Sequence, residues 1–446
     1  MDNLELNKID PAQWYVLNFE LIENTLNGRK KIPFHHTRKA AISRFSDLGF
    51  PTPRNEEWKY TNVAPIIQQK FKFLPEPAKL PKAILNDFMF KGEVENIVVV
   101  VNGQYSEELS SFNLKSDGVI IDSLRNMLQH RPQIAEQYLG RFAAFESETF
   151  TALNTAFTLE GAFVYVPEGR ILEEPIQIIY LSDSTKQAHV SHPRNLFVLG
   201  RGSQARIIEC YHHLSKNIYF NNVVTEVFMD DHAIADHIKI QEESESAYHI
   251  ANTQIHQECS SVYSSVNIDL GGALVRNNLN VLLNAEGCET HLFGFYFGEG
   301  SQHIDNHTFI DHAKPRCSSN ELYKGILDGK ARGVFNGKIM VRPEAQKTNA
   351  FQSNKTLLLT NEASINAKPQ LEIFADDVKC THGATIGQLD DEALFYLRAR
   401  GIGEKVAAAM LRYAFVADVF ENIKVEAVRE KLDAKIIERL KKVERF

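Results

Sequence analysis

The stretch FGFYFGEGSQHIDNHTFID, from Phe293 to Asp311, carries the pattern that decides the fold of this chain. It holds two short segments of strand character, FGFYF and NHTFID, separated by a connection that contains glycine. In a strand, successive side chains point to opposite faces, whereas a helix repeats its apolar face every three to four residues. The pattern here has the strand period, so we predict two short strands.

Segments of this kind follow one another from about Gly161 to Ala375, and their centres recur roughly every 13 to 18 residues. Short strands at even spacing are typical of a β-sandwich, a β-propeller or a β-solenoid. We favour the solenoid, because there is no blade signature of about 40 residues and the connections seldom contain the Asn-Gly or Asp-Gly of tight hairpins. Further segments are ARIIECYH (Ala205–His212), HIKIQ (His237–Gln241), VNIDL (Val266–Leu270), LNVLL (Leu279–Leu283), GKIMV (Gly337–Val341) and KTLLL (Lys355–Leu359).

Helical patterns flank this β-rich region on both sides. We therefore divide the chain into an N-terminal, mainly helical region with a small strand element (1–155), a parallel β-helix core (156–385) and a C-terminal helical domain (386–446). In the first region we expect helices over Ala12–Leu26, Arg38–Leu48 and from about Ser123 to Leu153, and a strand with a turn at Ile97–Ser106.

The C-terminal region has clear helix boundaries and an apolar face. Asp390 and Asp391 are candidates for an N-cap, and Gly401 and Gly403 mark a break between helices. One face of the following helix carries an apolar stripe. We expect this stripe to pack mainly on the protein's own core, and a docking platform for a partner is the alternative. The stripe consists of Val406, Met410, Tyr413, Ala417 and Phe420.

Composition excludes several classes of function. The formal net charge is −8 and the isoelectric point is about 6.1, which argues against a broad nucleic-acid footprint. The first residues, MDNLELNKID, lack a basic and apolar targeting pattern, and no apolar run reaches the ~18 residues of a spanning helix. We therefore expect a cytoplasmic protein without membrane attachment. The five cysteines are scattered and odd in number, as expected of reduced thiols.

The run DDVKCTHGAT, Asp376 to Thr385, is the most suggestive site pattern. Cys380 and His382 are two residues apart, so a strand would place the thiol and the imidazole on the same face. Both groups are ligands for a soft metal, but zinc and iron–sulfur sites normally need four ligands. The pair is therefore half a site, which another chain would complete. The alternative is that both side chains only contribute to packing.

Three other patterns carry weaker signals. His303, Asp305 and His307 share a strand face, but no fourth ligand follows at a diagnostic spacing, so we expect a solvated polar face rather than a metal site. Gly333 to Lys338 is one residue short of a phosphate-binding loop and is followed by Ile339 instead of Ser or Thr. Gly401 and Gly403 lack the third glycine of a dinucleotide fingerprint.

Three longer motifs carry a family resemblance. They are PTPRNEEWKYTNVAP (Pro51–Pro65), the run ELYKGILDGK to THGATIG (Glu321–Gly387) and LFYLRARGI (Leu394–Ile402). Together they resemble the SufB/SufD family of iron–sulfur cluster assembly scaffolds, and within it the SufD branch. SufB-like chains carry a CGAH-type element and a HEAT-type motif, where this sequence has TNEASINAKP (Thr360–Pro369) and HGAT (His382–Thr385).

The resemblance implies a right-handed parallel β-helix and a scaffold subunit rather than an enzyme. It implies that SufB binds at the end of the β-helix, that the SufC ATPase binds the C-terminal helices, and that this chain itself binds no nucleotide. His382 and Cys380 correspond to interface residues of the family, where a transient iron–sulfur cluster shared with SufB is assembled. Whether the chain forms a homodimer when alone, and whether the complex binds reduced flavin, are left open by the resemblance.

The sequence leaves two further hypotheses about function open. The chain could be a purely structural subunit, in which Cys380 and His382 provide no cluster ligand. Parallel β-helices also serve as polysaccharide lyases or hydrolases, for which Asp230 with Asp231, or Asp376 with Asp377, would be the acidic groups.

Single residues of the motifs have simpler interpretations. We assign Trp58, Lys59 and Tyr60 to packing, expect Cys317 to be buried, and regard Arg398 and Arg400 as solvated or facing SufC. These side chains are therefore not placed in the candidate site.

Overall fold

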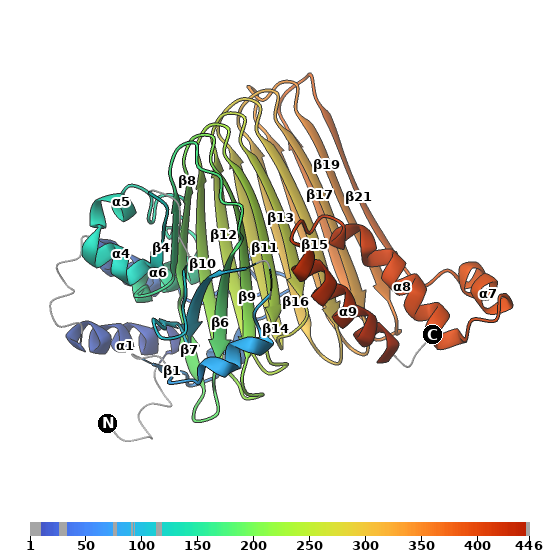
Figure 1. The fold of residues 1–446 in the computed structure, drawn as a ribbon, viewed down its shortest axis with the longest axis horizontal. Coiled ribbons are helices and arrows are strands. Elements are labelled where there is room, and N and C mark those ends of the chain that lie inside the picture. The colour runs from blue at the N-terminus through green and yellow to red at the C-terminus, as the bar shows by residue number, and fades with distance from the viewer. Residues whose placement is uncertain are drawn as a thin grey trace.

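The structure is a computed structural model that describes residues 10–25, 34–74, 78–90, 92, 94–112 and 118–442. Its centre is a parallel β-solenoid in which the chain passes alternately between two sheets (Figure 1). Helices flank the solenoid in the sequence, as predicted: the N-terminal ones lie beside its first strands, and the C-terminal ones lie along one of the two sheets, sheet B (Figure 1). The right-handed sense stays an inference from the family resemblance and from the strong preference of parallel crossovers for that hand.

Sheet A and sheet B each contain every second strand of the solenoid. Sheet A has the order β20-β18-β16-β14-β12-β10-β8-β5-β4, and sheet B has the order β21-β19-β17-β15-β13-β11-β9-β6-β2-β3. The strands of sheet A are β4 (Ile120–Ser123), β5 (Ala162–Val166), β8 (Arg194–Leu199), β10 (Phe220–Met229), β12 (Tyr248–Gln257), β14 (Leu274–Leu283), β16 (His303–His312), β18 (Arg332–Val341) and β20 (Ser364–Ile373), with β7 (His189–Ser191) beside β10 and β1 (Lys72–Phe73) beside β7. Those of sheet B are β2 (Asn96–Val101), β3 (Gln104–Tyr105), β6 (Ile176–Ser182), β9 (Gln204–His213), β11 (Ile234–Glu242), β13 (Val262–Asp269), β15 (Glu289–Gly298), β17 (Ser318–Leu327), β19 (Asn349–Leu358) and β21 (Lys379–Gly387).

Successive coils stack in register. Ser318 of β17 pairs with Asn349 of β19, which in turn pairs with Lys379 of β21. Each residue therefore lies beside the residue that follows it by one coil in the sequence. A side chain that points inward in one coil has a neighbour that points inward in the next. The sequence expectation of short parallel strands is confirmed, because each predicted segment falls within or overlaps an observed strand.

The interior between the sheets is mostly apolar but contains a polar network near its middle. The buried Glu209 carboxylate is 2.9 Å from Nε2 of His237, and Nδ1 of the same imidazole is 2.9 Å from the hydroxyl oxygen of Tyr263. The three residues belong to successive strands of sheet B, β9, β11 and β13. Polar groups enclosed here are thus satisfied by partners in neighbouring coils.

The N-terminal region forms a cap beside the first strands of the solenoid (Figure 1). Helix α6 packs against α2 and against β10 of sheet A. The predicted strand and turn at Ile97–Ser106 are observed as the β2–β3 hairpin, and β2 pairs in parallel with β6. The helices are α1 (Pro11–Thr25), α2 (Phe34–Leu48), α3 (Ala64–Ile67), α4 (Leu124–His130), α5 (Pro132–Glu136) and α6 (Thr149–Phe157), with short 3-10 turns at Glu56–Trp58 and Lys82–Asp87.

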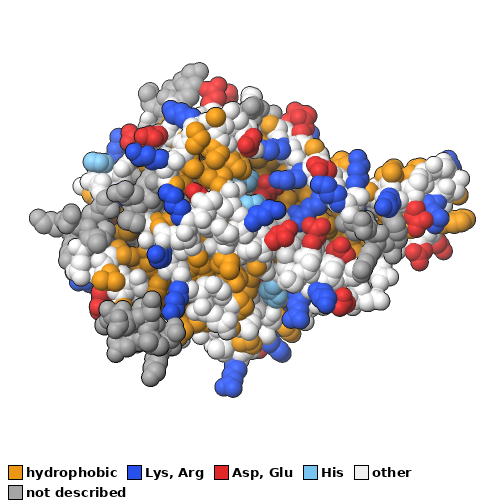
Figure 2. Space-filling model, turned by 90° about the horizontal axis from the view of Figure 1, so that it is seen from below, with side chains coloured by type: hydrophobic (Ala, Val, Ile, Leu, Met, Phe, Trp, Pro, Cys, Tyr) orange, Lys and Arg blue, Asp and Glu red, His pale blue; other side chains and the backbone are white. Residues whose placement is uncertain are grey.

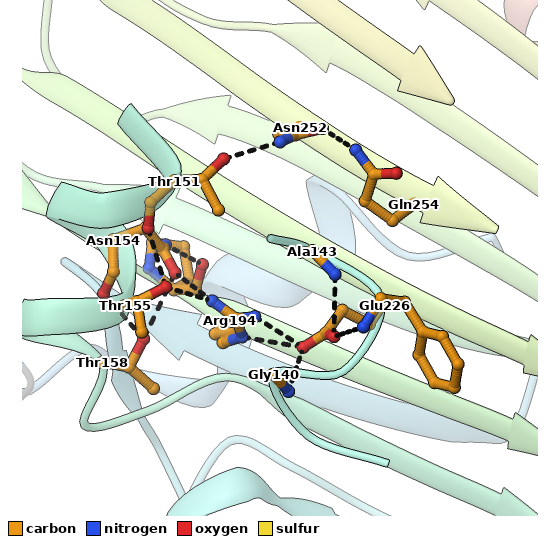
Figure 3. Close-up of polar contacts among 12 residues, drawn as sticks. Gly140, Ala143, Thr151, Asn154, Thr155, Thr158, Arg194, Glu226, Asn252 and Gln254 are labelled. Carbon is orange, nitrogen blue, oxygen red and sulfur yellow. Dashed lines mark hydrogen bonds and ion pairs between the residues drawn. The ribbon is translucent and has the colours of Figure 1, made fainter. Parts of the chain in front are cut away.

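A fully buried ion pair anchors this cap to sheet A (Figure 3). The Arg194 guanidinium donates to the Glu226 carboxylate at 2.7 and 2.9 Å, and to the hydroxyl of Thr155 in α6 at 2.8 Å. Glu226 also accepts hydrogen bonds from the backbone N–H groups of Gly140 and Ala143. One ion pair between β8 and β10 thus holds two separate segments of the cap.

The C-terminal helices return along the outside of sheet B. They are α7 (Asp391–Ala399), α8 (Glu404–Phe420) and α9 (Glu426–Lys442), and α8 contacts β15 and β17. The Asp390 carboxylate accepts hydrogen bonds from two backbone N–H groups of α7, which confirms it as an N-cap. In the described part of the chain, no helix has the length and apolar character needed to span a bilayer.

The apolar stripe of α8 is divided between two environments. Phe420 is buried against Phe295 of sheet B, with ring centroids 5.5 Å apart. Val406 and Met410 are about half exposed, at 50% and 48%. The expectation that the stripe packs on the protein's own core is therefore wrong for its first half, because the helix extends beyond the sheet.

Glu226→Gln should loosen the N-terminal cap. It leaves the Arg194 guanidinium buried without its counter-charge, which typically costs about 3–5 kcal/mol. Both tryptophans of the chain, Trp14 and Trp58, lie in this region, so tryptophan fluorescence during urea unfolding reports its stability.

Lys330→Gln is the matched control, because Lys330 pairs with Glu362 on the exposed surface. It should change the stability by less than about 1 kcal/mol. Equal shifts of the fluorescence transition in both variants would contradict the anchoring role of Arg194 and Glu226.

Candidate functional site at the open end of the solenoid

The last coil of the solenoid has two unpaired edges. Strand β20 pairs with β18 and strand β21 pairs with β19, and no described strand lies on the far side of either (Figure 1). At the other end, the N-terminal cap and the β2–β3 hairpin cover the first coils. An uncovered row of backbone N–H and C=O groups is a template for pairing with another chain.

Cys380 and His382 lie on β21, within this last coil. They are in register with Ala350 and Gln352 of β19, which are both buried and point inward. The thiol and the imidazole therefore share the inward face of the last coil, which has no coil above it. His382 is exposed, whereas Cys380 is partly buried against the core. This burial raises the pKa of the Cys380 thiol, so the isolated chain favours the protonated form.

His382 continues a polar column from the solenoid interior. Glu321, Gln352 and His382 occupy the same register position in three successive coils of sheet B. Nε2 of Gln352 donates to the Glu321 carboxylate at 2.8 Å, and Oε1 of Gln352 has no hydrogen-bond partner among the described residues. Burial raises the pKa of Glu321 to about 7. The buried column thus reaches the surface at the imidazole.

Exposed apolar side chains surround the end of the solenoid. Ile386 on β21 is 50% exposed, and Phe374, directly after β20, is 61% exposed. Phe351 and Ile373 are also among the exposed large hydrophobic residues. We did not single out these residues from the sequence. Pro369 within β20 was an available signal, because proline has no N–H to donate and is confined to edge strands.

Cys380 and His382 are two side chains of types that bind metals, which is fewer than a complete ligand set. Within the described ranges, no three His, Cys, Asp or Glu side chains come close enough to hold a metal ion together. Cys380 and His382 therefore need ligands from outside the described residues before they reach the usual four.

The N-terminal motif covers the polar residues of β16: Asp305 is fully buried and His303 and His307 are partly buried, so the expected solvated face is wrong. The Asp305 carboxylate accepts hydrogen bonds from Arg276 at 2.9 Å and from the Thr61 hydroxyl at 2.5 Å, and lies 3.0 Å from Nε2 of His307. Arg276 stacks on Trp58, 3.8 Å from the ring centroid. The cluster thus attaches the segment around Trp58 to sheet A.

The remaining motif residues have structural places. Gly333 to Lys338 lies within strand β18, so it is not a phosphate loop. Trp58 and Cys317 are buried as expected, whereas Tyr60 is 38% exposed, so its assignment to packing is wrong. The conformation of Gly401, with φ of +85°, confirms a break between α7 and α8.

Comparison with known proteins identifies the family. The model of the SufBD core domain of the SUF system for FeS cluster assembly matches residues 180–415, and the model of the SufBD N-terminal region matches residues 10–178. The chain belongs to the SufBD family. It is therefore a SufBD family iron–sulfur cluster assembly protein, and the resemblance noted from the sequence motifs is confirmed.

Relatives in this family match nearly the whole chain. An iron–sulfur cluster assembly SufBD family protein of Synechocystis is 33% identical over 403 residues, covering 89% of this chain and 88% of the relative. SufD of Escherichia coli is 29% identical over 435 residues, 96% of each chain. SufD of Bacillus subtilis is 27% identical over 421 residues, 90% of this chain and 92% of the relative. The family's SufD members are thus homologues over both the cap and the solenoid.

Glu321→Gln should change how stability depends on pH. The folded state holds a proton on Glu321 up to a pKa of about 7, whereas the unfolded value is 4.5. Between these values the folded state binds more protons, so its stability falls as pH rises and levels off above 7. Removing this group should make the variant gain roughly 3 kcal/mol relative to wild type between pH 4.5 and 7.

Urea unfolding followed by circular dichroism at several pH values measures this difference. Glu362→Gln, at an exposed position, is the control and should run parallel to wild type. If the Glu321→Gln curve also runs parallel, the carboxyl is not held protonated inside the column.

Proposed function

We propose that this chain is the SufD-like subunit of a SufBCD complex and that iron and sulfide are assembled at its open end, where SufB continues the solenoid. The observation that carries the proposal is the position of Cys380 and His382 on the inward face of a last coil with free edges. Membership of the SufBD family supports an assembly scaffold rather than an enzyme.

A solenoid of the same family is a suitable partner for this end. Its terminal strand would satisfy the free backbone groups of β20 and β21 and bury the surrounding apolar side chains. The sequence resemblance implies that SufB takes this role. When SufB is absent, the same end would be available to a second copy of this chain.

The proposed chemistry depends on two side chains that would bind iron and leave its coordination incomplete. A cysteine thiolate and a histidine nitrogen both bind iron, and a cluster needs more ligands than this chain offers. Since burial keeps the Cys380 thiol protonated, iron must displace its proton on binding. A site that is completed only by a partner can hold its cargo while the partner is docked and release it when the interface opens.

The exposed apolar surface of α7 and α8 is the proposed docking site for the SufC ATPase. Phe395 and Tyr396 are 72% and 57% exposed, and Val406 and Met410 continue this surface along α8. Helix α7 forms one tip of the molecule (Figure 1), and Figure 2 shows hydrophobic side chains at this tip. Energy for opening the interface would then come from a nucleotide bound by SufC rather than by this chain.

His382→Ala should remove cluster assembly without removing the complex. The imidazole is exposed at the open end and makes no contact that the fold of the described residues requires. We expect iron and acid-labile sulfide in the co-purified SufB–SufC–SufD complex to fall at least about tenfold at equal complex yield, because each lost ligand weakens the site strongly.

Thr381→Ala is the matched control, because Thr381 is the exposed neighbour on the opposite face of β21. It should leave the iron and sulfide content unchanged. Wild-type metal content in His382→Ala would favour the purely structural reading, and loss of the complex itself would show that His382 is needed for docking.

Met410→Asp should weaken the binding of SufC. A charge placed in the centre of an apolar contact typically costs more than about 1.4 kcal/mol, which is at least a tenfold loss of affinity. Calorimetric titration with purified SufC measures the loss, and Lys330→Asp on the solenoid controls for a change of surface charge. Unchanged binding of SufC to Met410→Asp would exclude this face as the docking site, whatever the outcome for His382.

A further inference from the structure

Cys288 and Cys317 occupy equivalent positions in two successive coils. The backbone N–H of Glu289 donates to the carbonyl oxygen of Ser261 at 3.0 Å, and that of Ser318 donates to Cys288 at 2.9 Å. Asn349 donates in the same way to Cys317 at 3.1 Å. One position thus repeats along the solenoid as Ser261, Cys288, Cys317 and Thr348, all four buried.

The two thiols of this column are in contact. Each sulfur lies 3.2 Å from the same acceptor, the carbonyl oxygen of Ala285. The interaction between the two side chains lowers the pKa of Cys288 and raises that of Cys317. Of the two thiols, Cys288 therefore loses its proton more readily than Cys317.

We propose that Cys288 and Cys317 are a site of reversible covalent modification, in which a peroxide oxidises them to a disulfide that links the two coils. Neighbouring strands of a sheet lie about 4.8 Å apart, and a disulfide requires about 4.4–6.8 Å between Cα atoms. Equivalent positions in adjacent coils meet this requirement without a change of register.

The reaction balances with peroxide as the oxidant. The Cys288 thiolate attacks one peroxide oxygen, the O–O bond breaks, and a sulfenic acid and one hydroxide form. The Cys317 sulfur then attacks the sulfenic sulfur, the S–S bond forms and the S–O bond breaks. The proton of Cys317 leaves with the second oxygen as water, and the hydroxide takes up the proton that Cys288 gave up on forming its thiolate, so the net products are one disulfide and two waters. An external thiol reverses the reaction by exchange.

The pair lies close beneath the surface. It sits under the turn that connects β14 to β15, where Ala285, Glu286 and Gly287 precede Cys288. Glu286 and Arg316 form an exposed ion pair outside this turn. A local opening of this connection, rather than unfolding of the solenoid, is enough to admit a small oxidant.

The other cysteines provide internal references. Cys210 is fully buried, and its burial raises its pKa to about 12, so it should be inert. Cys259 and Cys380 are partly buried and lie in other coils. Oxidation at these positions would give sulfenic or sulfinic acids rather than a bond to Cys288 or Cys317.

The test is a titration of the purified full-length chain with hydrogen peroxide, followed by alkylation, proteolysis and mass spectrometry. We expect a peptide pair joined through Cys288 and Cys317, with a mass loss of two hydrogens, that disappears after dithiothreitol. Its formation should raise the thermal midpoint of the wild type and leave that of Cys288→Ser unchanged. If Cys288 and Cys317 are both still alkylated at a peroxide concentration that fully modifies Cys380, the proposal is wrong.

A shift of the pair by one coil tests whether register causes the reaction. Ser261→Cys combined with Cys317→Ser moves the two thiols to positions 261 and 288, which are also in contact. This variant should form the disulfide again, whereas Cys317→Ser alone should not. If the wild type forms the disulfide but the shifted pair at positions 261 and 288 stays reduced, register alone does not cause the reaction. These outcomes do not depend on SufB, SufC or His382.

Discussion

In-register pairing of parallel strands between successive coils is the interaction on which the rest of this structure depends. Each coil satisfies the backbone N–H and C=O groups of the coil before it and leaves its own to the next. Such a stack has no natural end, so both of its ends must be covered. The N-terminal cap covers the first coils through the buried pair of Arg194 and Glu226. The last coil has free edges in the described chain, and in the proposed complex a partner covers them.

The register between coils also determines which side chains become neighbours. Residues about thirty positions apart in the sequence become direct neighbours, and they form columns along the solenoid. Glu321, Gln352 and His382 form one such column, which ends at the open coil. A column of this kind places an imidazole at the end of the molecule with support from the buried coils below it.

Much of this architecture was predictable from the sequence. The strand period of Phe293–Phe297 and its neighbours predicted the solenoid, and the spacing of Cys380 and His382 predicted their shared face. Burial of the Asp305 cluster was not predictable, because its partner Thr61 lies more than two hundred residues earlier in the chain. The half-exposed stripe at Val406 was also missed, since an apolar helical face has the same pattern whether it meets its own core or another protein.

Hydrogen–deuterium exchange measured on the chain alone, with SufB and with SufC shows directly whether a partner pairs with the free edges of the last coil. We expect SufB to slow exchange of the amides in β20 and β21 at least about tenfold, because their free edges become paired. SufC should leave these strands unchanged and protect α7 and α8 instead. Unchanged exchange of β20 and β21 with SufB bound would mean that SufB does not pair with these edges.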